Sequence, residues 1–142
     1  MTVAVAHQDS TTARLALAHA VQEAAFRDTD LAVLHVVDSA LDADREEAYR
    51  LGVSDEIERA VGKDADVTWK LHLKTGSGDV GDVIVSLVDR LGVDLLVLGA
   101  RRRTPVGKAL LGSVAQTIIL EANVPVLVVK APQRPGHRSG GG

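Results

Sequence analysis

Hydrophobic and polar residues follow two periods along this chain, one typical of strands and one typical of helices. Short, mainly apolar runs predict buried strands over residues 2–6, 31–37, 94–98 and 124–129. Residues 67–74 instead alternate strictly between apolar and polar side chains, which is typical of a strand with one wet face. This alternation favours the edge of a sheet for the third strand.

Apolar residues at helical spacing predict helices in the segments between these strands. The predicted helices cover residues 13–24, 42–61, 80–91 and 113–122. The stripe over 80–91 is the clearest, and Gly92 ends it. Residues 42–61 are rich in charge and carry few apolar anchors, so they predict a surface helix that is broken or bent near Gly52.

The alternation of strands and helices predicts an α/β domain with a single doubly wound, open, parallel five-stranded sheet and helices on both faces. With the alternating strand at one edge, the favoured strand order is 3-2-1-4-5. The winding then reverses between the first and fourth strands, where ligands bind outside the carboxyl ends of the strands. The flanking loops are residues 7–10 and 99–112. We assign residues 1–132 to this domain and expect the Gly-rich tail, residues 133–142, to be disordered.

The amino-acid composition argues against several classes of function. The chain has 142 residues, 46% of them hydrophobic, but its only aromatic residues are Phe26, Tyr49 and Trp69. A net charge of −3 and so few stacking side chains argue against a nucleic-acid partner. The absence of cysteine excludes disulfides and thiolate metal sites. We find neither a signal peptide nor an apolar run of membrane-spanning length, so we expect a soluble, cytoplasmic protein without membrane association.

The segment between the fourth strand and the last helix has the chemistry of an anion site. Gly99 allows close backbone approach, and Gly112 with Ser113 marks a helix start whose free N–H groups attract anions. The side chains of residues 101–103, all arginine, can bind phosphate through paired hydrogen bonds. The spacing matches neither a P-loop nor a dinucleotide fingerprint. An alternative stays open, in which Ser113 is an ordinary cap and the arginines are a solvated run.

Histidine is the other residue type with potential chemistry. The five histidines do not have the spacing of metal ligands, so no metal site is predicted. His35, in an apolar strand, is interpreted as a hydrogen-bonded core residue. His7 falls in the first loop of the predicted cleft, where it can contact a ligand. No Ser, His and Asp are placed to form a catalytic triad.

The segment 95–130 resembles the universal stress protein family, and the resemblance extends over most of the chain. The residues that carry it are Gly99, Gly112-Ser113, the run Val124-Pro125-Val126-Leu127-Val128-Val129, the run Leu34-His35-Val36-Val37-Asp38, and Gly76. The resemblance implies the same five-stranded fold, a homodimer, and ATP or AMP as ligand, with or without Mg²⁺. The nucleotide-binding residues that position and resemblance together suggest are Ala6, His7, Gln8, Asp9, Val37, Gly99, Arg101, Arg102, Arg103, Gly112, Ser113 and Val114.

The sequence departs from the family's ATP-binding pattern at two positions. That pattern is Gly, two residues, Gly, nine residues, then Gly with Ser or Thr, and Arg102 stands at its middle Gly. Gln8 stands where an Asp normally holds the ribose, although its amide can also hydrogen-bond a hydroxyl. Arg102 either contacts the phosphates or fills their site. The second case predicts a dimeric interaction module without nucleotide. No residue is placed to activate water, so any enzymatic activity is at most slow ATP hydrolysis.

The last strand suggests a protein partner. In the order 3-2-1-4-5 it lies at an edge, yet Val126, Leu127, Val128 and Val129 are uniformly apolar. Exposed apolar edges pair with other chains, so we predict a homodimer through this strand, as the resemblance also implies. The alternative is that the tail or a loop covers the edge.

Overall fold

The computed structural model describes residues 1–8, 11–37, 39–62, 66–76, 78–100 and 112–130. Strands and helices alternate along the described chain, as the sequence pattern predicts. Their bounds are β1 Thr2–His7, α1 Thr11–Phe26, β2 Asp30–Val37, α2 Ala43–Val61, β3 Trp69–Thr75, α3 Val80–Leu91, β4 Leu95–Ala100, α4 Ser113–Glu121 and β5 Val126–Lys130. The predicted arginine loop and the predicted disordered tail lie outside the described residues.

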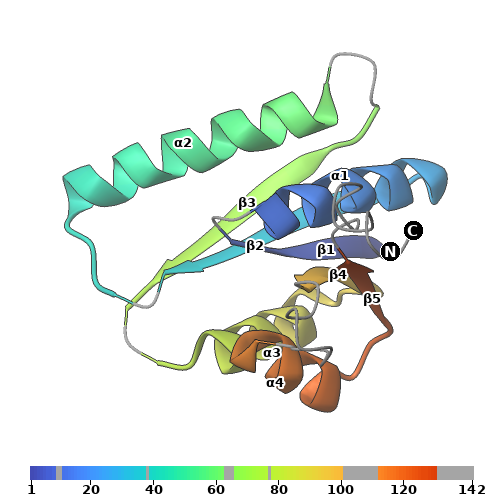
Figure 1. The fold of residues 1–142 in the computed structure, drawn as a ribbon. Coiled ribbons are helices and arrows are strands. Elements are labelled where there is room, and N and C mark those ends of the chain that lie inside the picture. Colours follow the sequence, from blue (N-terminus) through green and yellow to red (C-terminus); the bar gives the residue numbers. More distant parts are fainter. Residues whose placement is uncertain (9–10, 38, 63–65, 77, 101–111, 131–142) are drawn as a thin grey trace, which may run out of the picture.

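The five strands form one parallel sheet in the order β3-β2-β1-β4-β5, which confirms the predicted topology. Helices α1 and α2 cover one face, and α3 and α4 cover the other (Figure 1). Since β1 and β4 are neighbours in the middle of the sheet, the winding reverses between them. The carboxyl ends of these two strands are therefore the place where this topology favours a ligand.

The sheet separates two hydrophobic cores because successive residues of a strand point to opposite faces. Val3, Val5 and Val97 pack beneath α1 and α2. Leu34 and Leu96 pack against α3 and α4 on the other face. The strands β1 and β4 are buried on both faces, which explains their nearly continuous apolar sequences.

The helix over residues 42–61 differs from the prediction. Asp42 caps its start, since the side chain accepts a hydrogen bond from the Arg45 N–H, and the helix continues without a break to Val61. Gly52 is exposed and nothing lies near its missing Cβ, so its only cost is the intrinsic one for an interior glycine. Val53 and Ile57, both buried, hold the helix on the sheet and outweigh that cost.

Strand ends also differ from the prediction, with consequences for the site. β1 continues through His7 and β4 continues through Ala100. His7 and Gly99 are therefore strand residues rather than loop residues. The register of the sheet sets their side-chain directions, because each of the two residues is paired with a residue of a neighbouring strand.

Candidate functional site

The carboxyl ends of β1 and β4 and the start of α4 define the candidate site. Its described residues come from three places: Ala6, His7 and Gln8 at the end of β1, Gly99 in β4, and Gly112, Ser113 and Val114 around the start of α4. Val37 is the last residue of β2 and is partly buried. Asp9, Arg101, Arg102 and Arg103 lie outside the described residues.

The first turn of α1 explains the glycine at position 99. A Cβ built on Gly99 would lie 2.6 Å from Thr12 Cγ2 and 2.7 Å from the Thr12 carbonyl oxygen. Both distances are shorter than side-chain carbons reach in real contacts. Gly99 is therefore required for packing of β4 against α1. The close approach that the sequence predicted for a ligand is made here by Thr12 of the same chain, and contact of Gly99 with a ligand stays a prediction.

The start of α4 lacks the side-chain cap that begins other helices of this fold. In α3, Asp79 Oδ1 accepts a hydrogen bond of 3.0 Å from the Asp82 N–H. In α4 the N-cap position is occupied by Gly112, which offers no side chain, and no side-chain cap is formed. Ser113 is the first helical residue and not the cap, so the reading of Ser113 as an ordinary cap is wrong. Among the described residues, no side chain caps the first N–H groups of α4, and free groups of this kind can bind an anion.

The neighbouring side chains at the start of α4 have different surroundings. Gly112 and Ser113 are exposed, whereas Val114 packs partly into the core beneath α3 and α4. A Cβ at Gly112 would meet nothing within 4 Å, and the backbone there has an ordinary φ of −65°. The fold itself therefore does not require glycine at position 112, in contrast to position 99.

Gln8 carries an unusual polar atom at the end of β1. Its Nε2 is buried and has no hydrogen-bond partner within the described residues. A buried donor without a partner costs about 1–3 kcal/mol, so such atoms usually indicate a missing partner. Ala6, two residues before, is buried on the face of α3 and α4. The unpartnered amide of Gln8 thus marks the carboxyl end of β1 as a place for a polar ligand.

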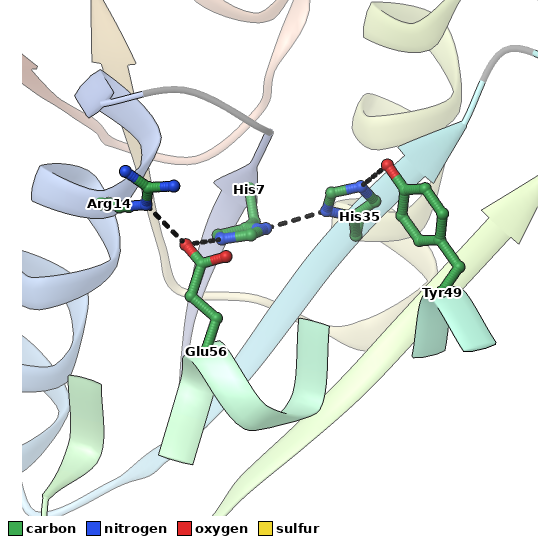
Figure 2. A network of polar contacts seen from close by, with 5 residues as sticks. All are labelled: His7, Arg14, His35, Tyr49 and Glu56. Atoms are coloured by element: carbon green, nitrogen blue, oxygen red, sulfur yellow. Dashed lines mark hydrogen bonds and ion pairs between the residues drawn. The ribbon is translucent and has the colours of Figure 1, made fainter. Parts of the chain in front are cut away.

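His7 and His35 form a buried pair that the sequence did not predict. The Nδ1 atoms of the two rings are 2.8 Å apart, and Figure 2 shows the rings facing each other across β1 and β2. His35 is 2% exposed, which confirms it as a hydrogen-bonded core residue. His7 is 0% exposed, so its expected position in an open loop is wrong. Contact between His7 and a ligand stays a prediction.

Each histidine also has a partner on α2. His7 Nε2 lies 3.1 Å from Glu56 Oε1, and His35 Nε2 lies 3.1 Å from the Tyr49 hydroxyl (Figure 2). Arg14 of α1 pairs with the same Glu56 oxygen at 3.5 Å. One signal in the sequence could have revealed the pair: both histidines lie near the ends of strands predicted to be neighbours.

Two further features are absent from the described residues. No group of three or more His, Cys, Asp or Glu side chains that could hold a metal ion is found there. In the same part of the chain, no helix combines the length and apolar character needed to cross a membrane.

Comparison with known proteins gives consistent results. The description "Universal stress protein family" belongs to the family model that matches residues 1–130. A "Universal stress protein" of Mycolicibacterium smegmatis is 38% identical over 119 residues, which are 82% of this chain and 88% of the relative. A universal stress protein structure from Archaeoglobus fulgidus has a TM-score of 0.72 and 29% identity, and the alignment covers 91% of this chain and 97% of that chain.

The solved neighbours include structures that are described with a ligand. The universal stress protein from Archaeoglobus fulgidus in complex with dAMP has a TM-score of 0.66 and 25% identity. The alignment covers 91% of this chain and 96% of that chain. Its ligand is an adenine nucleotide.

Proposed function

This chain belongs to the universal stress protein family, and we propose that it binds an adenine nucleotide, ATP or AMP, between the ends of β1 and β4. The observation that carries the proposal is the buried, unpartnered Nε2 of Gln8 at the end of β1. The start of α4, which has no side-chain cap, offers free N–H groups on the other side of the winding reversal. A relative of the same fold is described in complex with dAMP.

The two features suit different parts of a nucleotide. An amide N–H donates to a hydroxyl oxygen, so Gln8 would bind the ribose. The free N–H groups at the start of α4, helped by the helix dipole, would bind the phosphates. Exposed Gly112 leaves room for phosphate beside that helix end. Arg102 would then contact the phosphates rather than fill their site, and Mg²⁺ would accompany ATP.

A thermal-shift titration with ATP, Mg-ATP, AMP and buffer alone tests this proposal. A ligand at 100 times its Kd adds about 2.7 kcal/mol to the free energy of unfolding. For a domain of this size that is an increase in Tm of roughly 5–10 °C. No increase with any of the nucleotides at millimolar concentration would favour the module without nucleotide, in which Arg102 occupies the phosphate site.

Two variants separate ligand binding from folding. Gly112→Val should leave the Tm of the free protein near that of wild type, because its Cβ meets nothing within 4 Å. It should reduce the nucleotide-induced increase, since its branches occupy the space beside the α4 start. Gln8→Leu removes the unpartnered buried donor, so it should raise the Tm of the free protein while weakening nucleotide binding. If Gln8→Leu raises both the Tm of the free protein and the nucleotide affinity, or lowers both, a ligand-binding role for Gln8 is contradicted.

The proposal also includes a homodimer through β5. This strand is an edge of the sheet, and Val126, Leu127 and Val128 are only partly buried. The register with β4, together with the hydrogen bond from the Leu96 N–H to the Pro125 carbonyl, directs the N–H groups of Leu127 and Val129 toward β4. The N–H groups of Val126 and Val128 then point outward and can pair with a second chain.

Light scattering after size-exclusion chromatography tests the dimer. Val128→Pro removes an outward N–H and keeps the ladder to β4, so it should give a folded monomer. Leu127→Pro is the matched comparison, because it removes an inward N–H and should lower stability as well. A monomeric wild type, or a dimer that survives Val128→Pro, would contradict pairing through this edge.

A further inference from the structure

The histidine pair lies at a fixed register between two strands. His7 of β1 is paired directly with His35 of β2, and paired residues in a parallel ladder project from the same face. Both rings therefore point toward α2, where Glu56 and Tyr49 meet them (Figure 2). The four side chains form a polar connection between the sheet and α2 within an otherwise apolar core.

The contact between the two Nδ1 atoms restricts how many protons the pair can hold. A separation of 2.8 Å requires one hydrogen between the atoms, with one ring as donor and the other as acceptor. The neutral arrangement that satisfies these three contacts has Tyr49 as donor to His35 Nε2, His35 Nδ1–H as donor to His7 Nδ1, and His7 Nε2–H as donor to Glu56. With one added proton, His7 carries hydrogens on both nitrogens and donates to His35 Nδ1, and His35 Nε2–H donates to the Tyr49 oxygen.

A second added proton cannot be accommodated. Both Nδ1 atoms would then carry hydrogens and face each other at 2.8 Å, and two positive rings would repel within the core. We propose that His7 and His35 act as a proton-sensitive latch, which holds α2 on the sheet with zero or one added proton and releases it with two. This inference is independent of nucleotide binding.

Among the described residues, the charged and titratable side chains that face the pair come from α1 and α2. Glu56, from α2, faces His7, and its charge is shared with Arg14 of α1. Tyr49 of α2 faces His35. The residues of β3 and β4 on the same face are Trp69, Leu71, Leu73, Thr75, Leu95, Val97 and Gly99, none of which titrates near neutral pH. Elsewhere on α2, Glu46 and Arg50 pair with each other at 3.8 Å.

NMR of the imidazole nitrogens tests the latch directly. The protein should carry His19→Gln, His72→Gln and His137→Gln, so that His7 and His35 are the only imidazoles. Long-range ¹⁵N–¹H correlation from pH 8 to pH 5 reads the protonation of each nitrogen. Fluorescence of Trp69, the single tryptophan, reports release of α2, because Trp69 packs against the core that α2 covers.

We expect the two rings to be opposite tautomers at pH 8, with one hydrogen between the Nδ1 atoms. On acidification the docked protein should take up one proton on the pair. The second added proton should appear only together with the change in Trp69 emission and the loss of amide protection in α2. The equilibrium constant for release should then rise tenfold for each unit of pH lowered, because the released state holds one more proton.

Two variants distinguish a latch from a purely structural contact. His35→Gln leaves a single imidazole, which can be fully protonated without repulsion, so the release of α2 should move to lower pH. Tyr49→Phe leaves both imidazoles in place, so the pair should still take up only one added proton while α2 is docked. If His35→Gln does not fold, the ¹⁵N–¹H spectra of the protein that keeps both His7 and His35 still test the proposal. Identical tautomers at pH 8, or two fully protonated rings with α2 still docked, would overturn the proposal.

Discussion

Replacing Gly99 by alanine tests the packing of β4 against α1. The substitution adds a methyl group where the structure leaves no room for one. The new carbon would lie 2.6 Å from Thr12 Cγ2, 2.7 Å from the Thr12 carbonyl oxygen and 3.0 Å from its carbonyl carbon. The Thr12 methyl can move with its side chain, but the carbonyl belongs to the first turn of α1 and moves only with the helix.

The size of the effect follows from these distances. Carbon atoms in good contact are about 3.5–4.0 Å apart, so α1 would have to shift by about 1 Å. Overpacking of this kind costs about 1–3 kcal/mol. The equilibrium constant for unfolding should therefore rise roughly 5- to 150-fold, and Tm should fall by roughly 2–12 °C.

Denaturant unfolding followed by Trp69 fluorescence measures this loss. Gly52→Ala is the matched control, because its Cβ meets nothing within 4 Å in the exposed interior of α2. It should raise the free energy of unfolding by about 0.5–1 kcal/mol. Combining Gly99→Ala with Thr12→Ala should recover only part of the loss, since the carbonyl remains. A Gly99→Ala protein as stable as wild type would refute the packing argument.

The remaining predictions concern a helix cap and a titrating side chain. Asp79→Ala removes the hydrogen bond to the Asp82 N–H and should cost about 1 kcal/mol in chemical denaturation, whereas Asp79→Asn keeps an acceptor and should lose less. A full loss with asparagine would show that charge, not the hydrogen bond, matters. Burial, and then the charges of Lys70 and Lys74, lower the pKa of His72 below its ordinary value of 6.5. The unfolded chain therefore binds this proton first as the pH falls, so wild type should lose stability from about pH 7.5 downward relative to His72→Gln. Parallel stability profiles for the two proteins between pH 8 and pH 5 would contradict this.

The candidate site was only partly predictable from local pattern. Gly99 was expected to serve a ligand by permitting close backbone approach, and Gly112 by marking a helix start with free N–H groups. The structure separates them: position 99 is filled by Thr12, and position 112 is open. The difference depends on where α1 lies relative to β4, two elements far apart in the sequence. The same holds for Gln8, whose unpartnered amide is a property of its surroundings.

The order of strands followed from the sequence alone, because the strand and helix periods are local and the handedness of parallel crossovers leaves few arrangements. The alternating residues of β3 placed that strand at an edge, and the remaining order followed. Tertiary structure decided what local pattern does not contain. Burial of Val53 and Ile57 carried α2 through Gly52. The register of β1 and β2 brought together His7 and His35, 28 residues apart, and packing of α2 supplied their partners. Such contacts depend on atoms that meet only when the sheet has formed.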